Sequence, residues 1–308
     1  MKFQRDVLIE AICERASNDR NLFFLSADFG APALDHFCEE LPEQFLHMGI
    51  SEQNMVDVAA GLALEGRIVF IYAMAPFVTL RCLEQHKTST GLMNLPVCTI
   101  AAGVGLGYAD AGPTHYATED HACLRSLVNA TVYTVSDAAT TKAIGENFCE
   151  NPHYSFIRLD RAALPSLGND ASATNAVEKG YRKLTKGKEL CVITNGYMTH
   201  RVMAAIGTNS AFSDRVGVID LIRSKPFPEG LVDNLRVAKS VLVVEEQTPP
   251  DALSSAVLEF VCDKSLATPV KRMSLPERYF FDNGGREWLL DDAGLSVNDI
   301  ASTMEKLL

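Results

Sequence analysis

The sequence lacks the features that mark several classes of protein. No run of about 18 apolar residues occurs, so no membrane-spanning helix is expected. Lysine and arginine together number 28 against 39 aspartate and glutamate residues. The resulting net charge of −11 argues against a nucleic-acid partner, because phosphate binding needs basic patches. The first 20 residues predict an amphipathic helix without a signal-peptide core, so we expect a cytoplasmic protein.

Cysteine pairs are also missing, because no C-x-x-C occurs in the sequence. This argues against the common zinc and redox motifs and favours reduced, buried thiols. The cysteines are scattered and lie mostly in apolar runs, at Cys13, Cys38, Cys82, Cys98, Cys123, Cys149, Cys191 and Cys262.

Apolar residues, in contrast, are plentiful. They make up 47% of the 308 residues, which is enough for two packed domains at roughly 150 residues per domain. Short apolar runs alternate with helical patterns, as is typical of βαβ units and of a parallel sheet with helices on both faces. The sequence therefore predicts an α/β fold with two doubly wound domains and mainly parallel sheets. We place these domains at residues 1–168 and 185–308.

The expected elements follow from these patterns. Strands of the first domain are expected at residues 22–27, 67–73, 97–102, 131–135 and 154–159. Helices are expected between them at residues 53–64, 77–90, 118–127 and 138–149. The polar segment 165–189 is predicted to be a linker. Beyond it, strands are expected at 190–196, 216–221, 240–246 and 270–274, and helices at 200–208, 252–262 and 297–307.

One acidic residue opens a helix whose body is almost wholly apolar. In "MGISEQNMVDVAAGLALEG", Glu52 falls in the first helical turn and Ser51 is a suitable N-cap. The small residues that follow permit close approach of another backbone, so the helix is expected in a core or a subunit interface. The carboxylate is either a favourable charge at the helix dipole or a functional acid, and the local pattern leaves both open.

Three further stretches follow expected strands, where the loops of an open parallel sheet build ligand sites. "GVGLGYADAGPTHYATED" carries His115, which can exchange protons near neutral pH, but its glycines do not form a phosphate fingerprint. In "FIRLDRAALP", Arg158 and Arg161 are either surface ion pairs or a clamp for phosphate or carboxylate. In "AMAPFVT", Phe77 is either a core residue or a stacking face for a flat heterocycle.

These stretches, in this order, resemble the C-terminal half of transketolase. "HMGISEQNMVDVAAGLALEG" is similar to the family's G-[IV]-x-E-Q/H-x-M segment, and "GPTHYATEDHACLRSLVNATVYTVSD" to its G-P-T-H segment. "FIRLDRAALP", "VIDLIRSKPFPEG" and "VLVVEEQTPPDALSSAV" extend the resemblance over essentially the whole chain. It is strongest to split transketolases, whose two halves are separate polypeptides.

The resemblance implies thiamine diphosphate as cofactor and transfer of a two-carbon ketol unit between sugars. Glu52 matches the carboxylate that hydrogen-bonds N1′ of the aminopyrimidine and helps its 4′-amino group to take a proton. Phe77 matches the aromatic that packs on the pyrimidine, with Met74 beside it. Asp28, in "LSADFG", matches an acidic residue near the cofactor.

Two positions match substrate contacts of the family, and other contacts are missing. His115 matches the histidine that faces the sugar hydroxyls, and Arg161 the arginine that holds the sugar phosphate. "SADFGAPA" has no hydroxyl where the family has a phosphate-binding serine. The place of a second phosphate contact, a histidine, falls near Gly103, and Asp110 is shifted from the family's aspartate. The substrate is therefore expected to be an unusual sugar, modified or nucleotide-linked.

The sequence also has no G-D-G segment, with which thiamine enzymes hold Mg²⁺ and the diphosphate. An N-terminal-half transketolase subunit is therefore expected to supply these ligands, in a heterotetramer in which this chain also dimerises. Alone, the chain is expected to bind the cofactor poorly and to show no turnover. The alternatives are a beta-like component of a 2-oxoacid dehydrogenase, a deoxyxylulose-phosphate synthase-like enzyme, and a non-catalytic scaffold subunit.

Overall fold

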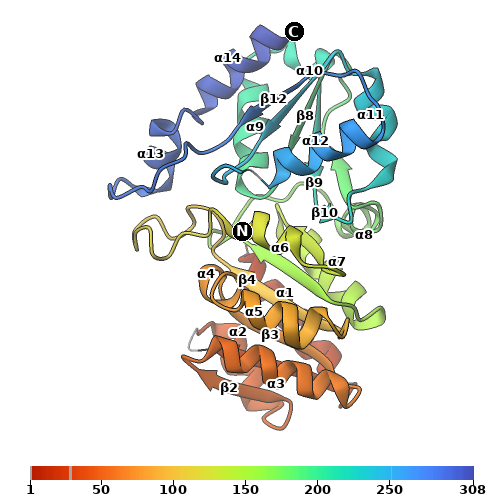
Figure 1. Cartoon of the computed structure of the whole chain (residues 1–308), viewed down its shortest axis with the longest axis vertical. Helices are drawn as coiled ribbons and strands as arrows, with labels where there is room; N and C mark the ends of the chain where they lie inside the picture. Colours follow the sequence, from red (N-terminus) through yellow and green to blue (C-terminus); the bar gives the residue numbers. More distant parts are fainter. Residues whose placement is uncertain (1, 28–29, 251) are drawn as a thin grey trace.

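The apolar runs of the first half form the central strands of a mostly parallel sheet in the lower domain of Figure 1. The computed structural model describes residues 2–27, 30–250 and 252–308. The strand order is β10-β5-β6-β4-β3-β1-β2, and every pairing is parallel except that of β10 with β5. The strands are β1 (Leu22–Ala27), β2 (Phe45–Gly49), β3 (Ile68–Met74), β4 (Val97–Ala102), β5 (Thr131–Thr134), β6 (Ser155–Leu159) and β10 (Arg223–Lys225).

Helices cover both faces of this sheet because the strands are apolar on both sides. One face packs on α1 (Gln4–Ala16), α2 (Pro32–Glu40), α7 (Ala138–Glu150) and α8 (Asp170–Lys179). The other face packs on α3 (Glu52–Leu64) and α4 (Ala75–Val78). The remaining helical segments of this domain are α5 (Leu83–Gln85), the π-helix η1 (His86–Gly91) and α6 (Asp120–Ser126).

The second domain repeats the design on a smaller scale, above the first in Figure 1. Its strand order is β12-β11-β8-β9-β7, with only β7 antiparallel among the described pairings. The strands are β7 (Tyr181–Lys183), β8 (Leu190–Thr194), β9 (Val216–Leu221), β11 (Ser240–Val244) and β12 (Val270–Met273). One face packs on α9 (Tyr197–Gly207), α13 (Gly285–Asp292) and α14 (Val297–Leu307), and the other on α11 (Val232–Val237) and α12 (Leu253–Asp263). The short segments α10 (Phe212–Arg215) and η2 (Glu229–Leu231) complete this domain.

The predicted fold class is confirmed, but the continuous helix expected at residues 77–90 is wrong. The chain there forms α4, α5 and η1 instead. The Nε2 atom of the buried His86 lies 2.7 Å from the carbonyl oxygen of Val78, and the amide of Cys82 bonds Thr79. A continuous helix would need that carbonyl for Cys82. Burial lowers the pKa of His86 to about 4, so the ring stays neutral and donates to Val78.

The segment expected as a linker contains secondary structure. Asn169 caps α8 by accepting a hydrogen bond from the amide of Ser172, and Gly180 ends it in the left-handed conformation. Helix α8 then packs in the core of the first domain, while β7 pairs with β9 of the second. Strand β10 returns from the second half to pair with β5. The two domains therefore share elements along their boundary.

No helix among residues 2–27, 30–250 and 252–308 has the length and apolar character that crossing a membrane requires. Most of the cysteines are buried and free, as expected, although Cys38 and Cys262 are exposed.

Candidate active site

Glu52, Phe77 and His115 follow the carboxyl ends of β2, β3 and β4, three parallel strands of the same sheet. Glu52 begins α3 and is 6% exposed, and Phe77 follows β3 in α4. His115 comes from the loop after β4, and its ring packs edge-on against Phe77 with centroids 5.4 Å apart. The structure thus brings His115 and Phe77 into contact from separate strand ends.

Arg81 links Glu52 to the ring of Phe77. Its Nη1 donates to Oε2 of Glu52 at 2.9 Å, and its guanidinium carbon lies 4.2 Å from the centroid of the Phe77 ring. Arg81 is not predicted from the sequence, in which the only signal is its position four residues beyond Phe77. In the part of the chain that the structure describes, no hydrogen bond reaches the second oxygen, Oε1, of Glu52. Arg81 therefore anchors one oxygen of this carboxylate.

The remaining predicted cofactor contacts have different outcomes. Met74 is half-buried at the end of β3, three residues before Phe77. Ser51 occupies the N-cap position of α3, but its hydroxyl donates to the carbonyl of Met48 at 2.5 Å and does not cap the helix. Asp28 lies outside the described residues, so its role stays a prediction.

The loop of residues 103–117 carries His115, and its start requires glycine. Gly103 has φ +81°, and a Cβ there would lie 1.8 Å from the ring of Tyr108. Gly105 and Ala117 exchange backbone hydrogen bonds of 3.0 Å, which close the base of the loop. His115 is half-buried, and its Nδ1 lies 2.9 Å from the hydroxyl oxygen of Thr114. The imidazole is thus held between this hydroxyl and Phe77.

Arg161 lies beside the same loop and is bound to it. Its Nη1 donates to Oδ1 of Asp110 at 2.5 Å, and its guanidinium carbon lies 4.6 Å from the centroid of the Tyr108 ring. The hydrogen bond from Arg161 holds the pKa of the Asp110 carboxyl below its usual value. The adjoining cavity of 340 Å³ is lined by Gly107, Arg161, Ala162, Tyr197, Arg286 and Glu287. Asp110 therefore already pairs with the cation that would meet an anionic group of a sugar.

Arg158 is neither a surface ion pair nor an anion clamp. Its guanidinium forms two hydrogen bonds to Asp120, of 2.9 and 2.7 Å, and a third to Thr134. The side chains of Arg158 and Asp120 are 2% and 0% exposed, so the pair ties β6 to the start of α6 inside the domain. Arg158 is structural in this fold.

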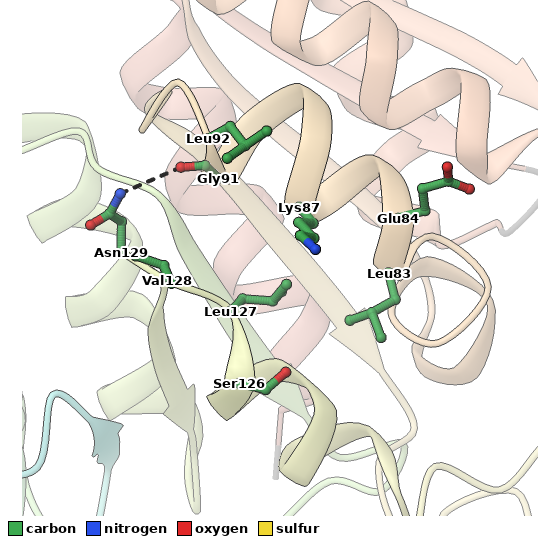
Figure 2. A pocket seen from close by; sticks show the side chains of 9 residues that line it. All are labelled: Leu83, Glu84, Lys87, Gly91, Leu92, Ser126, Leu127, Val128 and Asn129. Atoms are coloured by element: carbon green, nitrogen blue, oxygen red, sulfur yellow. Dashed lines mark hydrogen bonds between the residues drawn. The ribbon is translucent and has the colours of Figure 1, made fainter.

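A larger cavity, of 720 Å³, lies away from these residues (Figure 2). It opens between α5 and η1 on one side and the segment after α6 on the other, where Asn129 donates to the carbonyl of Gly91 at 3.4 Å. None of the candidate residues that the structure describes lines it, and its walls are mainly apolar. The candidate site is therefore defined by the side-chain contacts at the ends of β2, β3 and β4.

Comparison with known proteins agrees with this geometry. Residues 4–166 match the family model of the transketolase pyrimidine-binding domain, and residues 179–300 match that of the transketolase C-terminal domain. The putative transketolase C-terminal section of Methanocaldococcus jannaschii is 27% identical over 95% of this chain and 92% of its own length. One of the subunits of the apulose-4-phosphate transketolase of Phocaeicola vulgatus is 26% identical over 97% of this chain and 95% of its own.

A solved structure shows the same fold over the whole chain. A split gene transketolase, described as an inactive beta4 tetramer, superposes with a TM-score of 0.87 and 29% identity, covering 100% of this chain and 99% of that one. The relatives also include deoxyxylulose-phosphate synthases, of which this chain spans about half the length.

The fold and the contacts of Glu52, Phe77 and His115 define a two-domain α/β protein with a sheltered carboxylate and an aromatic ring at the carboxyl ends of its first sheet. The chain belongs to the transketolase family, and the resemblance predicted from its motifs is confirmed. It corresponds to the C-terminal half, which split members carry as a separate polypeptide.

Proposed function

We propose that this chain is the C-terminal subunit of a two-chain, transketolase-like transferase that moves a two-carbon ketol unit between sugars with thiamine diphosphate. The observation that carries the proposal is the contact series from Glu52 through Arg81 and Phe77 to His115. It places a sheltered carboxylate, an aromatic face and an imidazole at the carboxyl edge of one sheet. A non-catalytic scaffold has no need of this arrangement.

The residues present fit the pyrimidine end of the cofactor. Oε1 of Glu52 has no hydrogen-bond donor among the described residues, so it can accept one from a protonated ring nitrogen. Phe77 and Met74 are half-buried, so each offers surface to a flat ring. When bound, the cofactor supplies the carbon nucleophile that takes and releases the ketol unit.

The chain's own residues then have separate tasks. Glu52 holds a proton shared with the pyrimidine nitrogen, and Arg81 fixes the direction of its carboxylate. His115 packs against the ring of Phe77 and can donate to or accept from a hydroxyl of the sugar. Closing the site with a second polypeptide would exclude water from these groups and strengthen their interactions.

We also propose that a partner subunit provides the residues that bind Mg²⁺ and the diphosphate of the cofactor. Across residues 2–27, 30–250 and 252–308, no cluster of three or more histidine, cysteine or acidic side chains could hold a metal ion. We place the ligands on an N-terminal-half subunit and propose a cytoplasmic heterotetramer built on a dimer of this chain. The family's split members, whose halves are separate chains, support this organisation.

The test is reconstitution. The purified chain is mixed with the N-terminal-half subunit, thiamine diphosphate and Mg²⁺, and ketol transfer is assayed from several donor sugars. Turnover is expected in the mixture and not in either subunit alone. A signal that depends on pyruvate would favour a 2-oxoacid dehydrogenase or deoxyxylulose-phosphate synthase activity. Absence of transfer from every donor would support the scaffold alternative.

Arg81→Met is expected to weaken cofactor binding roughly three- to tenfold. A hydrogen bond to a charged group contributes on the order of 1 kcal/mol at a partly exposed site, and Glu52 would lose its fixed orientation. Isothermal titration of thiamine diphosphate into the reconstituted enzyme measures the change. Arg236→Met, which removes a surface pair with Asp233, serves as the matched control. Tighter binding in Arg81→Met would instead show that Arg81 competes with the cofactor for Glu52.

The substrate is proposed to be an unusual sugar, because Asp110 already neutralises Arg161. Asp110→Asn frees the guanidinium and is expected to lower KM for a sugar phosphate roughly three- to tenfold, while Arg161→Gln raises it. The hydrogen bond from Arg161 lowers the pKa of Asp110, so the pair stays ionised at neutral pH and above. The effect should therefore be constant above about pH 7.5, where the phosphate group is also fully ionised. Steady-state kinetics with phosphorylated and unphosphorylated sugars measure it. Asp292→Asn, a similar change at the Arg278 pair, is the control. An equal change for both kinds of sugar would contradict the proposed contact.

A further inference from the structure

The loop that carries His115 starts in the first domain but is packed into the second. Leu106, Ala109 and Tyr116 belong to the same apolar cluster as α9, α13 and α14, and Leu106 is fully buried. In Figure 1 this loop, drawn in yellow, leaves the lower domain and runs beneath the blue segment that leads to α13. The ends of the loop, Val104 and Ala117, stay in the core of the first domain with β4. The position of the part between them therefore depends on its contacts with the second domain.

Residues 246–248, which follow β11, form hydrogen bonds with both ends of the loop. Oε1 of Glu246 accepts a hydrogen bond from the amide of Leu106 at 3.2 Å. At the other end, Nε2 of Gln247 donates to the carbonyl of Ala117 at 3.1 Å, and the amide of Thr248 donates to Thr118 at 2.9 Å. The three consecutive residues therefore clamp the base of the loop from the second domain.

The contact with Glu246 is close enough to require glycine. Gly105 has φ +61°, and a Cβ there would lie 2.4 Å from Oε2 of Glu246. The loop backbone is thus pressed directly against the carboxylate. Any side chain at this position would separate the two.

Arg286 fixes Glu246 and reaches the first domain. Its guanidinium forms two hydrogen bonds to the Glu246 carboxylate, one of 2.8 Å, and its Nη1 lies 2.7 Å from Oδ2 of Asp160 at the end of β6. The face of the guanidinium lies over Tyr197, 3.8 Å from the ring centroid. The three charged side chains are 1–11% exposed, so these charge-assisted bonds are sheltered from water.

We propose that Glu246, oriented by Arg286, is a positioning residue that sets His115 against Phe77. The second domain then acts as a clamp on the loop of residues 103–117. Gly103, Gly105 and Gly112 all have positive φ, so this glycine-rich loop would gain much conformational freedom if it were released. The catalytic consequence rests on the function proposed above, whereas the clamp itself does not.

The first test measures loop opening and needs no activity. Amide hydrogen exchange of residues 103–117 is compared in the full-length chain, alone and with its partner subunit, for wild type, Glu246→Gln and Gly105→Ala. We expect exchange at the Leu106 amide to rise at least tenfold in both variants. Asp291→Asn is the matched control, because Asp291 pairs with the buried Arg201 away from the loop. Unchanged exchange in Glu246→Gln, or an equal rise in Asp291→Asn, would overturn the clamp.

The second test reads the position of His115. With carbon-13-labelled histidine, the His115 resonance carries the ring-current shift of Phe77 in wild type. It should move toward the random-coil value in Glu246→Gln and remain in place in Asp291→Asn. In the reconstituted enzyme, kcat should fall at least tenfold while the thiamine diphosphate Kd stays within twofold. A moved resonance with wild-type kcat would overturn the positioning role. If wild type transfers no ketol but the loop responds as expected, the clamp stands and the proposed function fails.

Discussion

Glu52→Gln is expected to lower kcat of the reconstituted enzyme about a thousandfold or more, with an unchanged melting temperature. The amide keeps the volume of the side chain and a carbonyl oxygen for Arg81, so the fold should persist. It cannot hold a shared proton with a ring nitrogen as a carboxylate does, and such proton-transfer roles contribute about 10²–10⁴-fold. Glu52→Ala should lose at least as much activity. Steady-state kinetics and thermal unfolding measure the two quantities.

The matched control for this change is Glu65→Gln, because Glu65 is exposed at the other end of α3. Its activity should equal that of wild type. Wild-type turnover by Glu52→Gln would remove Glu52 from its proposed role, and the opening acid of α3 would then be only a favourable charge at the helix dipole.

Arg158→Met is expected to destabilise the chain by about 3–5 kcal/mol, the cost of leaving a buried carboxylate without its partner. Asp120 would be left without its ion-pair partner in a place that is 0% exposed, and Thr134 would also lose a hydrogen bond. Urea denaturation of the purified chain measures the free energy of unfolding. Arg236→Met, at an exposed ion pair, should cost less than about 1 kcal/mol.

The double variant Arg158→Met/Asp120→Leu shows whether the loss of stability comes from an unpaired carboxylate or from lost packing. Replacing both charges removes the unpaired carboxylate, so most of the lost stability should return. If the double variant is as unstable as the sum of the single changes, the pair is not coupled as its geometry indicates.

Much of the fold could be predicted from the sequence because its signals are local. The run "VCTIAA" forms the fully buried β4, and the helix expected at residues 297–307 is α14. Such elements follow from residue type and period within a few positions. Short polar elements such as β7 and β10 were missed, because their stability comes from pairing with distant strands.

The residues of the candidate site could likewise be predicted only where their signals are local. Glu52, Phe77 and His115 could be named from motifs, because each lies at an element end with a recognisable neighbourhood. Arg81, Glu246 and Arg286 could not, since each acts through a contact with a distant part of the chain. Arg158 was misjudged for the same reason, because its partner lies 38 residues away.

By itself, the sequence determined the parallel α/β class, the order of the main apolar strands along the chain and the family to which its motifs belong. Only the tertiary structure decided which charges are buried together and how the second domain holds the His115 loop. The physical reason is the distance along the chain over which each signal acts. The spacing of apolar residues specifies helices and strands from neighbouring residues, whereas the partner of a buried charge depends on which distant segment folding brings beside it.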